Sequence, residues 1–426
     1  MRALKYYFLC LAFLATIGAN GQLFTEQYSI VNDAVSRYLS EVTYTSIEEP
    51  SRVIDYTVYT GERLDLPLPV VINVPSAYRN FVKKGLISFS YSFDKDFSES
   101  VTHTITLNKT QQQILIYDVQ PGMPCYYRFF LRGNLVHWGV FETEGQLRMI
   151  YVPSMGNVRD LGGWPVADGR SIKFGKLIRG IEMNGMHPAD EEDIHHLLDI
   201  GVAAELDLRA DYEDAHGISA FNFKSESEVE TGEVPTYLYM NDSGQLLKQM
   251  TQYSYLQRWR KEFQFIVQNL RLGRTVYYHC RWGADRTGYL SLLLEGLLGV
   301  GYDGLVKDYE LTSFNEGLRK EKESIDPIIS FIMTHRGTSL QQQFNTFWRQ
   351  RVGVSQDDID YFIEEMLEGE KIPDEDPVVT GIDDRQSPDN DVVKGYFSMD
   401  GKPIDRQHRG IILERYRDGK VRKIIR

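Results

Sequence analysis

The most constraining feature of this sequence is the stretch 271–290, which reads RLGRTVYYHCRWGADRTGYL. Residues 275–278 are β-branched and aromatic, which is typical of a short buried strand. The apolar run 289–294 suits a buried helix. Between them lies a short loop that begins at Cys280 and ends at Arg286. The stretch therefore predicts a strand, a tight loop and a helix in immediate succession.

This local architecture favours an anion site. A loop that enters a helix N-terminus turns successive backbone N–H groups toward one point, where the helix dipole adds positive potential. A cysteine at the strand end, near a guanidinium, is expected to react as a thiolate nucleophile. The planar fork of Arg286 matches two phosphate oxygens. Thr287 is placed to donate a hydrogen bond to the sulfur of Cys280, His279 can fix the strand end through its ring N–H, and Gly283 allows close approach of the backbone.

An alternative interpretation makes Cys280 a buried structural thiol and Arg286 a helix-capping charge. The residues around the pair favour the anion site, because a histidine precedes the cysteine and Asp-Arg-Thr-Gly follows at 285–288.

The run HCRWGADRTG at 279–288 resembles the signature loop of the cysteine-dependent tyrosine phosphatases, in particular a bacterial branch whose loop reads HCxxGxDRTG. Two upstream segments are similar to the same branch: 157–180, with its NVRDLGG, DGR and GKLIRG motifs, and 205–209, which reads ELDLR. Downstream, 308–312 and 353–355 also fit. The resemblance spans roughly 150–370, with the motifs in the family's order.

The resemblance implies an α/β cysteine-phosphatase domain with a central, mostly parallel sheet flanked by helices. It implies attack by a cysteine thiolate, a phosphocysteine intermediate and no metal or other cofactor. The implied catalytic residues are Cys280, Arg286, Asp285, Thr287 and Asp207. The implied substrate-binding residues are His279, Arg281, Trp282, Gly283, Ala284, Arg159 and Asp160.

The identity of the general acid stays open at this point. The resemblance points to Asp285 inside the loop, Asp207 at the end of the neighbouring strand is the rival, and Asp242 is the third candidate.

The residue before Asp285 bears on the substrate. Many members of the branch have lysine there, which suits phosphoinositides, whereas this chain has Ala284. We therefore expect a phosphorylated protein, or a small phosphomonoester, with phosphotyrosine favoured over phosphoinositides and inositol phosphates as the alternative. A hypothesis from another class is a catalytically weak, phosphate-binding or adhesive module, which the presence of Cys280, Arg286 and Thr287 argues against.

The N-terminus predicts export. Residues 1–21 combine Arg2 and Lys5, an apolar run at 6–17 and small residues, which is typical of a secretory signal peptide. The apolar run is too short to span a membrane, so no stable membrane insertion is expected after cleavage. The predicted location is secreted or periplasmic, with association with the outer surface as a further option. A net charge of −13 argues against nucleic acid as the main partner.

The rest of the chain predicts several further parts. Short alternating segments at 50–147 indicate a β-sandwich, and the corner at 119–128, VQPGMPCYYR, resembles that of fibronectin type III modules. The C-terminal stretch resembles the hairpin tails of exported bacterial proteins, although a plain stabilising appendage is the alternative. The predicted order is a signal peptide at 1–21, a lead-in at 22–49, the sandwich at 50–147, the phosphatase domain at 148–371, an acidic linker at 372–391 and a small β module at 392–426.

Overall fold

The computed structural model describes residues 28–57, 63–98, 102–117, 119–242, 250–315 and 317–372, and the strands at 393–397, 403–404, 411–416 and 421–425. The chain divides into two units, Met1–Ile372 and Pro373–Arg426. The predicted signal peptide at 1–21 lies outside the described residues, as does the predicted linker apart from Ile372.

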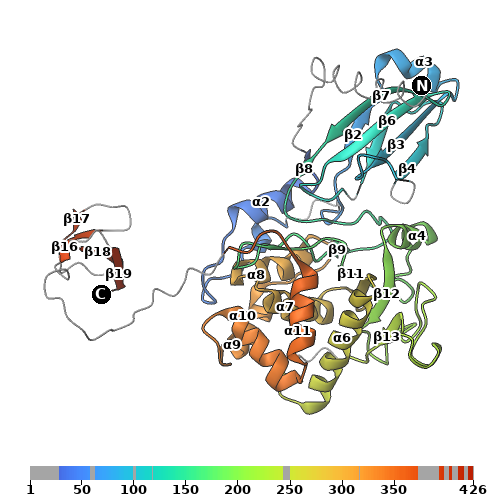
Figure 1. The fold of residues 1–426 in the computed structure, drawn as a ribbon. Coiled ribbons are helices and arrows are strands. Elements are labelled where there is room, and N and C mark those ends of the chain that lie inside the picture. The colour runs from blue at the N-terminus through green and yellow to red at the C-terminus, as the bar shows by residue number, and fades with distance from the viewer. Residues whose placement is uncertain are drawn as a thin grey trace, which may run out of the picture. The chain divides into compact units, whose positions relative to one another are not determined.

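A five-stranded sheet organises the part of the chain that contains Cys280 (Figure 1). Its order is β13 (Tyr237–Tyr239), β12 (Val202–Asp207), β14 (Thr275–His279), β11 (Leu177–Gly180) and β9 (Arg159–Asp160). The pairs among β13, β12, β14 and β11 are parallel, and β9 is antiparallel to β11. The predicted strand at 275–278 is β14, which is central and buried along its whole length. Burial from both sides explains its unbroken run of β-branched and aromatic residues.

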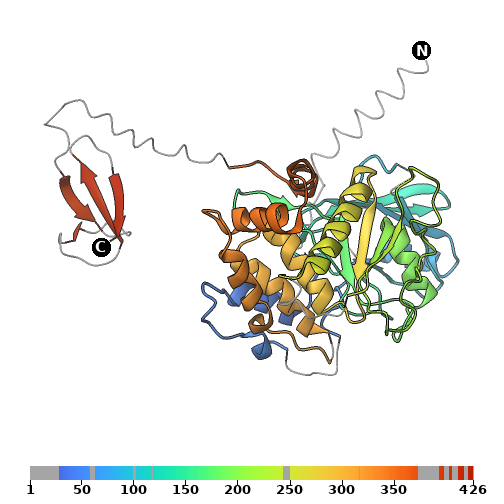
Figure 2. The same ribbon diagram turned by 90° about the horizontal axis from the view of Figure 1, so that it is seen from below.

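Helices gather beside this sheet, as Figure 2 shows from below. The central one is α7 (Asp285–Leu298), which is buried from Thr287 to Leu298 except at Tyr289, and most of its buried side chains are apolar. The ring N–H of Trp348 donates to the carbonyl of Leu293 in α7 at 3.0 Å. The other helices and helical turns of this region are α4 (Glu191–Asp199), α6 (Tyr253–Arg271), α8 (Tyr302–Glu310), η4 (Leu311–Phe314), η5 (Lys322–Ser324), α9 (Asp326–Met333), α10 (Leu340–Thr346), η6 (Phe347–Val352) and α11 (Gln356–Met366).

The residues before Met149 form a mainly β region preceded by a helix, α2 (Asp33–Glu41). One sheet pairs β2 (Val70–Asn73) with β5 (Gln113–Ile116). The other is antiparallel, in the order β4 (Thr102–Thr106), β3 (Ile87–Ser92), β6 (Cys125–Leu131) and β7 (Asn134–Phe141). Phe89 and Phe129, on neighbouring strands, are fully buried and in contact, with ring centroids 5.0 Å apart.

Short elements complete the first unit. They are β1 (Tyr28–Ser29), η1 (Val53–Asp55), η2 (Ser76–Tyr78), α3 (Arg79–Val82), β8 (Thr143–Glu144), β10 (Ser171–Ile172) and β15 (Leu367–Glu368). Strand β1 pairs with β8, and β10 pairs with β15. No helix in the described ranges is both long and apolar enough to cross a membrane.

The second unit contains an antiparallel sheet of β17 (Pro403–Ile404), β16 (Val393–Phe397), β18 (Ile411–Tyr416) and β19 (Val421–Ile425), in that order. With this sheet the chain is a mixed α/β protein of several parts, and that level of the fold prediction is confirmed.

Candidate active site

In the loop between β14 and α7, the backbone at position 283 leaves room only for glycine. Gly283 has a φ of +62°, and a Cβ atom at this position would lie 2.4 Å from the carbonyl oxygen of Gly180 at the end of β11. No real Cβ contact is so short, so the loop packs directly on the neighbouring strand. Cys280 is only 2% exposed and lies where the loop leaves β14.

Two side chains hold the carbonyl groups of this loop from behind. Asn157 donates through Nδ2 to the carbonyl oxygens of Gly283 at 2.9 Å and Trp282 at 3.3 Å. Arg179 donates through Nη2 to the Gly283 carbonyl at 2.9 Å. In a trans peptide the N–H points away from the C=O of the same unit. Fixing these carbonyls therefore favours amides of residues 283 and 284 that point to the opposite side, as an anion-binding loop requires.

The guanidinium of Arg286 lies close to Cys280 and is fixed on its other side. Burial alone would lower the pKa of Arg286, but the charges of Cys280 and Glu213 outweigh burial and raise it above its ordinary value. Arg286 donates through Nη1 to the carbonyl oxygens of Leu208 and Asp242, each at 3.1 Å. It donates to the Glu213 carboxylate through Nη1 at 2.5 Å and Nη2 at 2.8 Å.

Glu213 is the main residue of this site that the sequence reasoning missed. Its buried carboxylate also lies 3.3 Å from Nε of Arg281 and accepts a 2.6 Å hydrogen bond from the backbone N–H of Ala210. Burial opposes its ionisation, yet Arg286 and the other donors hold the pKa of Glu213 below its usual value. The available signal was its place four residues after the DLR motif at 207–209, but an acidic loop residue normally indicates a solvated surface.

The structure places two of the predicted substrate-binding residues, Arg159 and Asp160, in the interior. Arg159 bonds to Asp308 through Nε at 2.9 Å and to Asn157 Oδ1 through Nη1 at 2.6 Å. Asp160 accepts from the backbone N–H groups of Gly162 and Gly175. Since protein groups engage both side chains and both are 1% exposed, their contacts indicate support of the loop rather than contact with a ligand.

Asp308 connects this support to the rest of the fold. Its carboxylate accepts hydrogen bonds from Arg159 and, at 2.5 Å, from Nη1 of Arg179. The same Nη1 donates to the hydroxyl of Ser291 in α7. Burial opposes ionisation of Asp308, but the two guanidinium groups outweigh it and lower its pKa. The buried network thus links β9, β11, α7 and α8 beneath the loop.

His279 and Asp207 also lie inside the protein. Nε2 of His279 is 3.0 Å from Oε1 of Glu205 in β12, a contact that fixes the end of β14, and the His279 ring is fully buried. The Asp207 carboxylate accepts hydrogen bonds from the Arg209 guanidinium and, at 3.0 Å, from the Tyr237 hydroxyl. Burial raises the pKa of Asp207, but the combined effect of His279 and Arg209 is larger and opposite, so the pKa lies below its ordinary value. A carboxylate held ionised in this way is poorly suited to donate a proton.

The remaining candidates differ in exposure. Asp285 is 44% exposed in the first turn of α7, where Lys320 Nζ lies 2.7 Å from Oδ1 and the Tyr309 hydroxyl donates at 3.0 Å. Trp282 is 40% exposed, with its ring centroid 4.2 Å from that of His187.

The structure also places Asp242, Ala284 and Thr287. Asp242 is nearly buried and lies 3.6 Å from Arg258. Ala284 is buried in the loop. The Thr287 hydroxyl is buried and has no hydrogen-bond partner among the described residues, so the expected bond to the Cys280 sulfur is not formed in this conformation.

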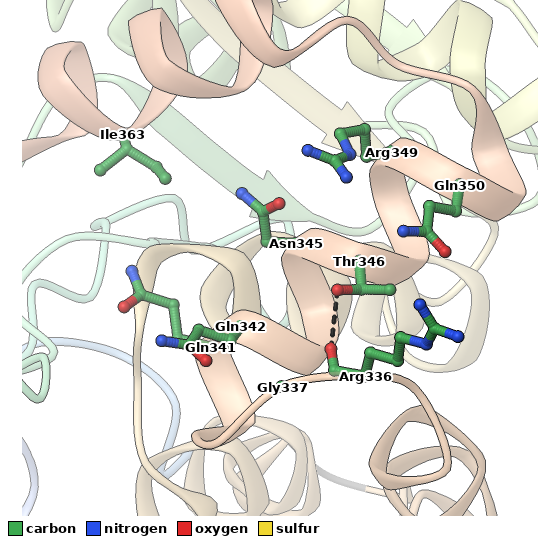
Figure 3. A pocket seen from close by; sticks show the side chains of 9 residues that line it. All are labelled: Arg336, Gly337, Gln341, Gln342, Asn345, Thr346, Arg349, Gln350 and Ile363. Carbon is green, nitrogen blue, oxygen red and sulfur yellow. Dashed lines mark hydrogen bonds between the residues drawn. The ribbon is translucent and has the colours of Figure 1, made fainter.

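Two further observations concern possible metal ligands and a pocket elsewhere in the protein. Within the described ranges, no group of three or more His, Cys, Asp or Glu side chains is arranged to hold a metal ion. A separate pocket of about 570 Å³, shown in Figure 3, contains none of the predicted site residues. It is lined by Arg336, Gly337, Gln341, Gln342, Asn345, Thr346, Arg349, Gln350 and Ile363.

Comparison with known proteins assigns this region. A family profile described as "Tyrosine phosphatase family" matches residues 150–368, slightly more than half of the 426 residues. The chain belongs to the tyrosine phosphatase family. A Cupriavidus necator protein named "Putative tyrosine-protein phosphatase" is 27% identical over 166 residues, which cover 37% of this chain. The match spans 60% of the length of that curated relative. The predicted tyrosine phosphatase family is therefore confirmed.

Proposed function

We propose that this protein is a phosphomonoesterase of the HCxxGxDRTG branch that works through a phosphocysteine intermediate, with phosphotyrosine as its preferred substrate. The observation that carries the proposal is the shared loop of Cys280 and Arg286, with the loop carbonyls held from behind by Asn157 and Arg179. This arrangement supplies a nucleophile and a set of anion donors at one point.

The proposed reaction has two steps. The Cys280 thiolate attacks phosphorus, an S–P bond forms, and the bond from phosphorus to the leaving oxygen breaks. Arg286 and the loop amides take up charge on the phosphoryl oxygens, and a carboxylic acid protonates the leaving oxygen. Water then attacks the thiophosphate, the S–P bond breaks, and the same carboxylate accepts the proton from water. Neither step requires a metal ion.

We assign the acid role to Asp285. Both Asp285 and Asp207 are contacted by a cation and a tyrosine hydroxyl, but the Asp285 side chain is 44% exposed beside the loop, whereas that of Asp207 is fully buried. A pH–rate profile tests the choice. Asp285→Asn should lower turnover and remove the part of the profile in which the rate changes with ionisation of the general acid. A profile that keeps this part would transfer the role to Asp242.

The central experiment measures hydrolysis of p-nitrophenyl phosphate in the presence of a chelator. We expect Cys280→Ala to lose at least about 1,000-fold in kcat, because the nucleophile is removed. Cys125→Ala is the matched control, since Cys125 is a buried thiol in β6 whose pKa burial raises to about 12. Activity retained by Cys280→Ala would contradict the mechanism.

The substrate preference is supported by the surroundings of the loop. Trp282 and His187 present aromatic surface beside it, and position 284 carries no positive charge. A phosphotyrosyl peptide should therefore be turned over faster than an inositol phosphate or a phosphoinositide. The reverse order would favour the phosphoinositide alternative, and tight phosphate binding without turnover would favour the binding module.

We further propose that the protein is exported to the periplasm or secreted, and that 50–147 is a fibronectin type III-like sandwich beside the phosphatase domain. The basis is the signal-like N-terminus together with the antiparallel sheets of this region. N-terminal sequencing of the mature protein tests export, and an N-terminus that still carries residues 1–21 would contradict it.

A further inference from the structure

Asn157, which holds the catalytic loop, is itself held by a residue outside the family region. Its backbone N–H donates to Oδ2 of Asp65 at 2.7 Å, and both residues are buried. Asn157 has a φ of +56°, a left-handed conformation that costs free energy for any residue other than glycine, although asparagine adopts it most readily. The bond from Asp65 stabilises this conformation.

Asp65 is fixed in turn by Arg63. The guanidinium forms two bonds with the carboxylate, Nε to Oδ1 at 2.7 Å and Nη2 to Oδ2 at 2.9 Å. Nη2 of Arg63 also donates to the carbonyl of Met155 at 2.6 Å, and Nη1 donates to that of Pro153 at 3.3 Å. Arg63 and Asp65 therefore bind the segment 153–157 through three of its backbone groups.

One residue separates this pair from the loop. The side-chain amide of Asn157 contacts the Gly283 and Trp282 carbonyls and accepts from Arg159. Because the backbone conformation of Asn157 sets the direction of its side chain, a change at Asp65 is expected to reach the loop carbonyls directly.

The N-terminal segment is also bonded to α8 and to the helical turn η5. Glu310, which ends α8, accepts from the Tyr44 hydroxyl at 2.8 Å and from the backbone N–H of Lys322 at 2.9 Å. Nζ of Lys322 donates to the Ile47 carbonyl at 2.8 Å. Lys320, two residues earlier, pairs with Asp285. Figure 1 shows α2 of this segment beside α8.

We propose that Asp65 is a positioning residue for the catalytic loop, and that residues 33–57 and 63–65 belong to the catalytic unit although the family region begins at 150. The proposal rests on the proposed function of that loop. It implies that the phosphatase region is incomplete when it is separated from the N-terminal segment.

The test uses the full chain with Asp65→Ala, Asp65→Asn and a matched control, Asp168→Ala. Asp168 also pairs with an arginine two residues away, at 2.8 Å, and forms no hydrogen bond or ion pair with residues 280–286 among the described parts of the chain. We expect Asp65→Ala to lower kcat about tenfold while KM changes less than about twofold, because the loop amides act mainly in the transition state. Asp65→Asn keeps one acceptor oxygen and should recover part of the loss, whereas Asp168→Ala should behave as the wild type.

Hydrogen exchange of the amides at 281–284, measured without substrate, gives a readout independent of catalysis. Faster exchange in Asp65→Ala than in both the wild type and the control supports the proposal. Wild-type kcat together with unchanged exchange in Asp65→Ala would overturn it. If the wild type hydrolyses no phosphomonoester, the proposed function fails, but the exchange comparison still decides the positioning role. If Asp65→Ala does not fold, Asp65→Asn carries the same comparison.

Discussion

The carboxylate of Glu213 and the guanidinium of Arg286 face each other in a two-point ion pair, with nitrogen–oxygen distances of 2.5 and 2.8 Å. A guanidinium has five N–H donors. Two further bonds from Nη1, to the carbonyls of Leu208 and Asp242, fix its plane. Within the described residues, Nε and one N–H of Nη2 make no hydrogen bond to protein. We propose that those two donors form the fork that binds two oxygens of a phosphate.

Replacing Glu213 should therefore reduce catalysis through Arg286. We expect Glu213→Gln to lower kcat/KM by about 10- to 100-fold, since Arg286 loses its charged partner and part of its orientation. The measurement is steady-state hydrolysis of p-nitrophenyl phosphate. Glu228→Gln, an exposed loop carboxylate bonded to Ser225, is the control. Equal rates for the two variants would show that Arg286 needs no such partner.

Gly283→Ala should remove activity because of a contact rather than backbone strain alone. The new Cβ would meet the Gly180 carbonyl, and we expect a loss of about 100-fold in kcat as the loop moves. Gly273→Ala is a close control, since Gly273 has a φ of +70° and open space around it. Both variants should lose about 1 kcal/mol or more of unfolding free energy, but only Gly283→Ala should lose turnover.

Asp308→Asn should destabilise the protein strongly, by about 3–5 kcal/mol, because it leaves two buried guanidinium groups without a charged partner. The measurement is urea unfolding of the wild type and the variant across pH. Since Arg159 and Arg179 lower the pKa of Asp308 against the effect of burial, its stabilising effect is complete above the unfolded-state pKa of about 4 and declines as pH falls below it. The difference between the two proteins should be constant from pH 8 to about 5 and shrink in acid. A difference that does not change in acid would contradict this origin.

Glu262 should make the protein less stable at higher pH. Burial, together with the charge of Asp242 and despite Arg258, raises the pKa of Glu262 from 4.5 to about 8. Between these values the folded chain holds a proton that the unfolded chain has released, so stability falls as pH rises. Glu262→Gln should raise the unfolding free energy by roughly 4 kcal/mol at pH 7.5 and by less than about 1 kcal/mol at pH 5. Thermal unfolding at the two pH values measures this, and equal shifts at both would contradict it.

The sequence by itself determined the local chemistry of the site. The strand, the loop with its cysteine, glycine and arginine, and the helix follow one another within 275–298. Short-range backbone preferences and side-chain reactivity were therefore enough to predict the loop and, with the neighbouring motifs, the family. The acid candidates could be named for the same reason, since Asp285 lies inside the loop and Asp207 ends a strand.

Only the tertiary structure decided which charged residues face the loop and which support it. Arg159 and His279 belong to recognisable motifs, yet Asp308 and Glu205 engage them in the interior. Glu213 and Asp65 lie in no motif, and their partners are 73 and 92 residues away along the chain. Contacts over such separations leave no periodic pattern in the sequence, because the partners meet only after burial of apolar surface has brought distant segments together and removed the water that would otherwise solvate them.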